Sequence, residues 1–182
     1  MTDAIVLLKN DHKEVERLFK QFEKLGDGAH VSKRRVVDQI IEALSVHAAV
    51  EEMHFYPAVR AAAPDIESDV LEGLEEHHVV KWTLSELQDL DPEHERFDAK
   101  VTVLIESVRH HVEEEEGELF PQVREAMGRK ALQELGAVLE QAKATAPVEP
   151  APKAPDEPPG NLVAGPAAGL ASRGKRKLLG KR

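Results

Sequence analysis

Two segments of the chain carry the same arrangement of histidine and glutamate. His47 precedes Glu51 by four residues, and His111 precedes Glu115 in the same way at an offset of 64 residues. Seven of the sixteen positions from 47 to 62 are identical to their counterparts, and each segment has a proline ten residues after its histidine. Residues four apart in a helix share a face. Each segment therefore presents an imidazole and a carboxylate together, and both are ligand types for metal ions.

Two further histidines complete a repeated set. Asp11 and His12 align with Glu76 and His77 at an offset of 65 residues, so the chain reads as two related helix pairs. Closing the pairs about a pseudo-twofold axis predicts that six residues meet in the interior: His12, His47, Glu51, His77, His111 and Glu115. Ionised carboxylates are costly to bury without a partner, so this set predicts a dinuclear metal site bridged by both glutamates. These ligands suit iron, manganese or zinc and do not choose among them.

Long stretches with apolar residues at spacings of three and four predict the helices that position these ligands. The expected helices run from Ile5 to Phe22, Val37 to His54, Val70 to Leu87 and Val101 to Glu118, with a weaker fifth segment from Arg129 to Lys143. Prolines are expected to end the second and fourth helices. We therefore expect an all-α fold, an up-and-down four-helix bundle with a pseudo-twofold repeat over residues 1–128, followed by a short packing helix over 129–145.

Charge and composition divide the chain near residue 146. Residues 1–146 hold 17 basic and 31 acidic residues, whereas residues 147–182 hold 7 basic and 3 acidic ones, with seven prolines and five glycines. This composition predicts that residues 146–182 form a disordered Ala/Pro/Gly-rich tail with a basic end. The net charge of −10 argues against unspecific nucleic-acid binding by the whole chain. The basic end lacks interleaved aromatic residues and is a weak signal for nucleic acid.

The absence of cysteine excludes several kinds of chemistry. Disulfides, zinc–thiolate sites, iron–sulfur clusters and thiol nucleophiles all require it. The start of the chain lacks a basic leader, and no stretch approaches the roughly 18 apolar residues of a membrane span. We expect a cytoplasmic monomer without a transmembrane segment, whose chemistry uses nitrogen and oxygen ligands.

The combined pattern resembles the hemerythrin-like (HHE cation-binding) domain family. That family carries His on its first helix, His-x-x-x-Glu on the second, His on the third and His-x-x-x-acid on the fourth, and the resemblance covers Asp3 to Met127. The resemblance implies a non-haem site of two Fe ions with a bridging oxygen, which meets O2, peroxide or nitric oxide. It also implies that the four histidines are terminal ligands and that Glu51 and Glu115 are the bridges.

One position departs from the oxygen-carrying members of that family. They have a second histidine four residues after the first on the third helix, where this chain has Lys81. If both irons are six-coordinate, the remaining ligands leave two positions open instead of one. This favours peroxide decomposition or iron oxidation and sequestration, in oxidative-stress protection, over reversible O2 carriage. The alternative is a non-enzymatic module that binds or senses O2, nitric oxide or iron, so catalase-like or ferroxidase-like oxidoreductase activity stays open here.

Four residues near the ligands are candidates for supporting roles. His54 and Glu118 occupy equivalent repeat positions, where they could orient ligands or handle protons, or lie at a helix end near solvent. Glu16 aligns with Lys81 in the repeat and could supply an extra ligand or pair with that lysine. A purely structural bundle is disfavoured because it leaves the buried carboxylates unexplained.

Overall fold

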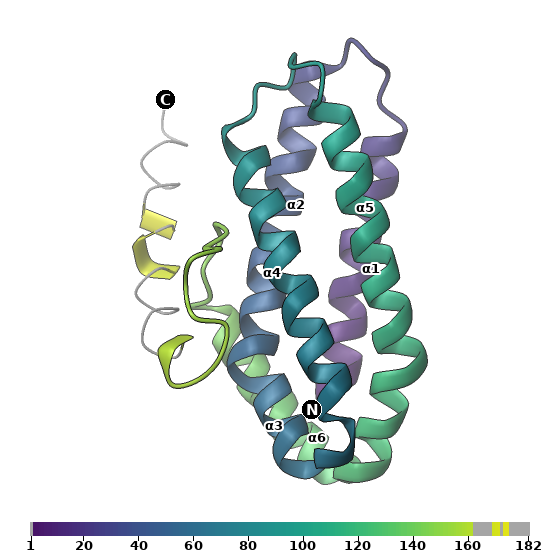
Figure 1. Ribbon diagram of the computed structural model, residues 1–182, viewed down its shortest axis with the longest axis vertical. Coiled ribbons are helices and arrows are strands. Elements are labelled where there is room, and N and C mark those ends of the chain that lie inside the picture. Colours follow the sequence, from purple (N-terminus) through teal and green to yellow (C-terminus); the bar gives the residue numbers. More distant parts are fainter. Residues whose placement is uncertain (1, 162–168, 172, 175–182) are drawn as a thin grey trace.

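The structure, a computed structural model, describes residues 2–161, 169–171 and 173–174. Its helices are α1 (Ala4–Glu23), α2 (His30–Val50), α3 (Tyr56–Ala62), α4 (Glu67–Asp89), α5 (Phe97–Glu114) and α6 (Phe120–Lys143). Helices α1, α2, α4 and α5 run alongside one another as an up-and-down bundle (Figure 1). The described residues contain no strand. The prediction of an all-α four-helix bundle is therefore confirmed.

The second and fourth helices continue past their prolines, which corrects the expectation that they end there. A π-helical turn at Glu51–Phe55 joins α2 to α3, and another at Glu115–Leu119 joins α5 to α6. In each turn the last amide donates across five residues, from Tyr56 to Glu51 and from Phe120 to Glu115. The wider π turn leaves room for the proline ring. Each proline also lies in the first turn of the next helix, where its missing N–H costs no helical hydrogen bond. Both π turns begin at a predicted bridging glutamate.

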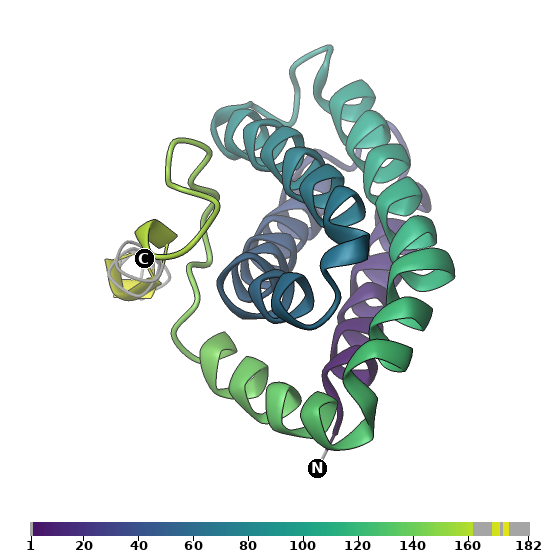
Figure 2. The same cartoon turned by 60° about the horizontal axis from the view of Figure 1, so that its bottom comes forward.

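The fifth predicted segment is the second part of α6. Gly128 interrupts this helix with a φ of 72°, a left-handed conformation that favours glycine. Beyond it α6 crosses the end of the bundle and contacts α1 (Figure 2). Gly136 permits the close approach, because a Cβ there would lie 2.3 Å from the carbonyl oxygen of Thr2. The start of α1 is fixed by Asp3, whose side chain accepts a hydrogen bond from the Val6 amide at 2.9 Å.

Two apolar clusters fill the bundle, and they leave a polar layer between them. One cluster contains Leu8, Phe55, Phe120 and their neighbours near the α6 end. The other contains Phe19, Leu84 and their neighbours toward the opposite end. The predicted metal ligands fall between these clusters in sequence on all four long helices. Close packing above and below therefore holds the ligands in place.

The structure describes the first part of the chain after α6, in the segment for which disorder was expected. Residues 147–161 lie along α2 and α4 (Figure 1), and Val148 and Asn161 are buried. The composition gives this segment no core of its own, but it docks on a surface that the bundle has already formed. Most of the basic end of the predicted tail lies outside the described residues. Among described helices, none combines the length and apolarity needed to cross a bilayer.

Candidate metal centre

The structure brings all six predicted ligands into the polar layer, and all six are buried. They form two overlapping groups whose ligand atoms lie within 4.8 Å of one another. The first ligand group consists of His12, His47, Glu51 and Glu115. The second ligand group consists of Glu51, His77 and His111. Glu51 belongs to both, as a bridging carboxylate would.

Individual distances show that the imidazoles converge through their Nε2 atoms. In the first ligand group, Glu51 Oε2 lies 3.0 Å from His47 Nε2. The same oxygen lies 3.4 Å from His77 Nε2 in the second group. Glu115 Oε2 lies 3.3 Å from His12 Nε2 and 3.6 Å from His111 Nε2. Both glutamates therefore reach histidines from both helix pairs.

The residues present fit a pair of cations. Buried atoms without a hydrogen-bond partner include Nε2 of His12 and His47, both carboxylate oxygens of Glu51, and Glu115 Oε2. His77 Nε2 faces His111 Nε2 at 3.2 Å, so two lone-pair donors also converge there. Buried polar groups are normally paired or bound to metal. Histidine nitrogens and carboxylate oxygens without thiolate form a donor set typical of iron, manganese or zinc.

The local electrostatics differ sharply between the two glutamates. Burial raises the pKa of Glu51 well above its ordinary value, and the charge of Glu115 raises it further. Burial also raises the pKa of Glu115, but the charges of His111 and His12, with a hydrogen bond from His12, lower it overall. Burial lowers the pKa of His47 to about 4, which keeps this imidazole neutral and able to bind a metal.

Each ligand histidine has a carboxylate near its Nδ1 atom, on the side away from the centre. We call these four residues the outer carboxylates: Asp11, Glu52, Glu76 and Glu116. Their oxygens lie 3.6 Å from His47 Nδ1, 3.2 Å from His77, 2.6 Å from His111 and 2.9 Å from His12, respectively. Such partners fix the tautomer and ring orientation of metal-binding histidines. Sequence reasoning did not identify them, although all four occupy matched positions of the repeat.

Three outer carboxylates also contact a lysine. Lys143 lies 2.5 Å from Asp11, and Lys9 lies 3.0 Å from Glu116. Lys81 Nζ lies 2.9 Å from Glu52 Oε1. Lys81, which stands where oxygen-carrying family members have a fifth histidine, thus contacts an outer carboxylate. Helix α6 supports another outer carboxylate through the contact of Lys143 with Asp11.

Tyr56 and Phe120 are equivalent in the repeat but act differently. The hydroxyl of Tyr56 donates a hydrogen bond to Glu115 Oε1 at 3.0 Å, and burial raises its pKa well above the ordinary value. Phe120 stacks on His12 with ring centroids 5.8 Å apart and offers no donor to Glu51. Gly73 makes room for the tyrosine, since a Cβ there would lie 2.9 Å from its oxygen.

The remaining sequence candidates lie farther from the ligands. Glu16 could have supplied an extra ligand or paired with Lys81, but its carboxylate pairs with Arg109 at 2.9 Å on the surface. Lys81 instead contacts Glu52. His54 is half-buried, and burial lowers its pKa. Glu118 is exposed and lines the cavity described next.

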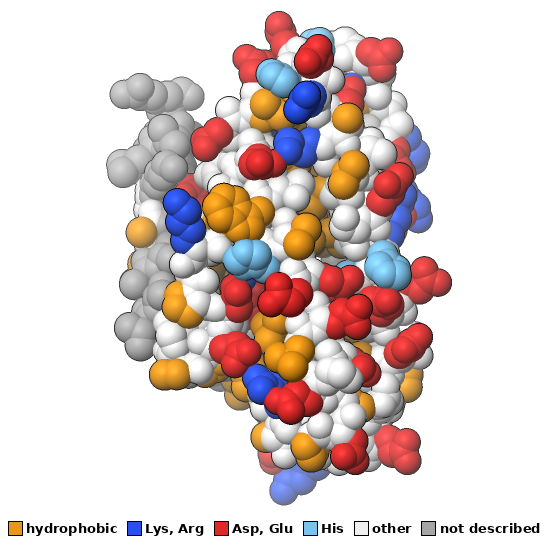
Figure 3. Space-filling model, viewed as in Figure 1, with side chains coloured by type: hydrophobic (Ala, Val, Ile, Leu, Met, Phe, Trp, Pro, Cys, Tyr) orange, Lys and Arg blue, Asp and Glu red, His pale blue; other side chains and the backbone are white. Residues whose placement is uncertain are grey.

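A cavity leads from the surface toward the second ligand group. Tyr56, His111 and Glu115 line its inner part. The other charged residues that line it are all acidic: Asp69, Glu72, Glu76, Glu114 and Glu118. The surface over α4 and α5 shows the same concentration of acidic side chains (Figure 3). A wider depression near His12 carries basic and acidic residues in equal number, so the acidic lining is specific to one side.

Fold and site together define a helical-bundle protein whose buried histidines and carboxylates form a cation site. The model of the hemerythrin HHE cation-binding domain matches residues 3–123. The chain belongs to this family.

Similar proteins agree with this assignment. An uncharacterized hemerythrin-like protein of Schizosaccharomyces pombe is 25% identical over 166 residues, which is 91% of this chain and 79% of that protein. A DNA nickase of a Nostoc species is 30% identical over 118 residues, 65% of this chain but only 32% of the nickase. The crystal structure of an HHE cation-binding domain protein from Mycobacterium kansasii superposes with a TM-score of 0.66 at 23% identity, covering 79% of this chain and 89% of that one. The similarity to the Mycobacterium kansasii structure supports the fold described for this chain.

Proposed function

We propose that this protein holds two iron ions and reacts with O2 or peroxide, with peroxide decomposition as its principal activity. The observation that carries the proposal is the direction of Lys81. Its ammonium group contacts Glu52 and Asp156 on the outer side of His77. Lys81 therefore does not take the place of the fifth histidine ligand that oxygen-carrying family members have at this position. Six protein ligands around two metals leave room for a small molecule to bind.

The bound irons would supply the redox chemistry, and the chain's own residues prepare the site for it. The outer carboxylates hydrogen-bond to Nδ1 of His12, His77 and His111, which directs Nε2 of these histidines inward, and Asp11 lies 3.6 Å from Nδ1 of His47. Tyr56 orients Glu115 and places a hydroxyl proton beside the second ligand group. Val15, Leu44 and Val108 line the side of the centre that faces the second apolar cluster, and they keep bulk water away.

A second candidate activity, oxidation and sequestration of iron, is favoured by the acidic cavity. A mouth lined only by acidic charged groups attracts cations and repels anions. At its rim Glu76, His110 and Glu114 lie close enough together to hold a cation. Ferrous ion would therefore reach the centre readily, whereas neutral peroxide would gain nothing from this charge.

The test is metal analysis of protein purified from its native host, followed by addition of peroxide. We expect two irons per chain and rapid O2 evolution in the wild type. His111→Gln should keep only one iron and lose O2 evolution, whereas the loop variant His94→Gln should keep both irons and the activity. Fewer than two irons in the wild type would contradict the proposal. Unchanged peroxide with an oxygenated or nitrosyl spectrum would favour the binding or sensing module instead.

His110→Gln separates the two candidate activities. The substitution removes one member of the rim group but leaves the ligands intact. Slower oxidation of added ferrous ion with unchanged peroxide decomposition would support the iron route. If His110→Gln oxidises ferrous ion as fast as the wild type does, the iron route is contradicted.

A further inference from the structure

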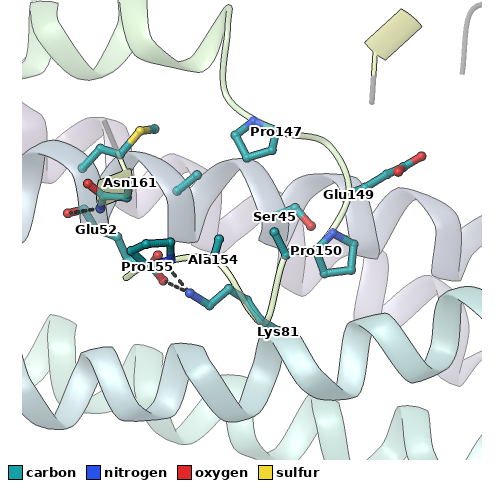
Figure 4. Close-up of a pocket in the computed structure, with 12 residues that line it drawn as sticks. Ser45, Glu52, Lys81, Pro147, Glu149, Pro150, Ala154, Pro155 and Asn161 are labelled. Carbon is teal, nitrogen blue, oxygen red and sulfur yellow. Dashed lines mark hydrogen bonds and ion pairs between the residues drawn. The ribbon is translucent and has the colours of Figure 1, made fainter. Parts of the chain in front are cut away.

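The segment from 147 to 161, which we call the strap, ends beside an outer carboxylate. It lies beyond the family match, which ends at residue 123. The strap and the bundle enclose a small cavity lined largely by apolar groups, including Pro147, Pro150 and Pro155 (Figure 4). Glu52, Lys81 and Asn161 are among the polar residues of its wall. The strap therefore shields a polar connection to the metal centre from solvent.

That connection runs through consecutive ionic contacts to a metal ligand. Asp156 of the strap pairs with Lys81 on α4. Lys81 lies 2.9 Å from Glu52 Oε1. Glu52 Oε1 in turn lies 3.2 Å from His77 Nδ1. A strap carboxylate is thus two residues removed from a histidine of the second ligand group.

Asn161 adds a second attachment at the same place. Its Nδ2 donates hydrogen bonds to the backbone oxygens of Glu52 at 3.1 Å and of Asp156 at 2.9 Å. Figure 4 shows Asn161 against Glu52, with Lys81 reaching Glu52 from α4. Because Glu52 lies in the π turn directly after Glu51, this contact also restrains the backbone of a bridging ligand.

The charges explain why the strap carboxylate matters. Lys81 is 7% exposed, and a buried ammonium group requires anionic partners. Glu52 must serve both this lysine and His77. With Asp156 present, Lys81 has a second carboxylate, and Glu52 can keep an oxygen toward the imidazole. Without it, Lys81 depends on Glu52 alone, and the apolar lining leaves little water to compensate.

We propose that Asp156 and Asn161 are positioning residues of the metal centre, which hold His77 in place through Lys81 and Glu52. The inference rests on the proposed di-iron site. It makes the strap a part of that site and predicts that its loss weakens one metal position selectively. The corresponding outer carboxylate of the first ligand group, Glu116, has Lys9 and is 33% exposed, so it has no comparable shield.

The test compares Asp156→Asn with the matched control Glu157→Gln. Glu157 is the next residue, carries the same charge and pairs with Arg60 on the surface at 3.1 Å. We expect Asp156→Asn to release one of its two irons to a chelator about tenfold faster, the lower end of the effect of losing a direct partner of a ligand histidine, because Asp156 acts on His77 through Lys81 and Glu52. Its optical spectrum should change, and Asp156→Glu should restore both properties. Glu157→Gln should match the wild type.

Melting of the apo and iron-loaded proteins distinguishes positioning from general stabilisation. A positioning role predicts that Asp156→Asn and Asn161→Ala reduce the rise in melting temperature on iron loading, with the apoprotein changed little. Equal losses in both forms with unchanged iron release would overturn the inference, as would identical release from Asp156→Asn and Glu157→Gln. A wild type that binds fewer than two irons would refute the proposed function instead.

Discussion

The two helix pairs supply equivalent ligands but give them different surroundings. At the first ligand group, Phe120 stacks on His12, and the outer carboxylate Glu116 is one-third exposed. At the second, Tyr56 lies beside His77 and donates its hydroxyl to Glu115 of the first group, and the outer carboxylate Glu52 is buried under the strap. The acidic cavity also opens on His111 of the second group. The repeat thus accounts for the matched residues, whereas the differences between its halves give the two groups different surroundings.

The largest expected effect comes from removing the shared ligand. Glu51 belongs to both ligand groups, whereas Glu115 groups with the first and lies 3.6 Å from His111 of the second. We expect Glu51→Gln to abolish iron binding and Glu115→Gln to retain one iron, as measured by metal analysis. The Glu51→Gln apoprotein should melt no lower than the wild type, because a buried carboxylate is replaced by a neutral group. Retention of two irons by both variants would show that neither glutamate bridges.

Lowering the pH should release iron from the two ligand groups at different pH values. Burial lowers the pKa of His111, but the charges of Glu115 and Glu76 and the hydrogen bond to Glu76 raise it overall above 6.5. The pKa of His47 is about 4. A proton competes with metal for a histidine, so falling pH should protonate His111 before His47. We expect stepwise iron loss on acidification, with the iron held by His111 leaving at a higher pH than the iron held by His47.

Glu76→Gln sharpens that titration. It removes the hydrogen-bonded carboxylate that raises the pKa of His111. The pKa of His111 in the apoprotein should therefore fall, while that of His47 stays in place, and loss of this partner should weaken the iron held at the second ligand group. Release of both irons in one step, in the wild type and the variant, would contradict a difference between the groups.

The presence of a tyrosine at position 56, where the other half of the repeat has Phe120, should have an intermediate effect on activity. Tyr56→Phe removes the hydrogen bond to Glu115 and should lower the rate of peroxide decomposition about 100-fold, the lower end of the range for a lost proton donor. The loss of stability should be about 1–3 kcal/mol, because a buried carboxylate loses a partner. Phe120→Tyr places a hydroxyl at the equivalent position and serves as the matched control. Equal rates in Tyr56→Phe and the wild type would remove Tyr56 from the chemistry.

The repeat explains why the sequence could predict that these six residues meet in the interior. Histidine and glutamate four residues apart indicate one helix face, and a matched second copy indicates a common site. The outer carboxylates Asp11 and Glu76 also stand at matched positions, next to ligands. They were missed because a charged residue beside a ligand normally points to solvent. Their orientation depends on the neighbouring helix, which local periodicity does not reveal.

The remaining differences arise from contacts between distant residues. Pro57 and Pro121 were expected to end helices because that rule assumes α-helical hydrogen bonding, and the π turns before them change the bonding. Residues 147–161 were expected to be disordered because their composition forms no core. Composition does not show that Asp156 meets Lys81, 75 positions away in the chain.

The smallest expected effect concerns Glu16, which corresponds to Lys81 in the repeat. Its carboxylate pairs with Arg109 at the surface, and its side chain is 35% exposed. Exposed ion pairs contribute less than about 1 kcal/mol, so Glu16→Gln should change the free energy of unfolding within that limit. Iron content and the spectrum should stay unchanged, because the Glu16 carboxylate pairs with Arg109 and Lys20 and not with a ligand side chain. Loss of iron in Glu16→Gln would make this residue a ligand of the first group, and the two halves would then differ in the ligands themselves.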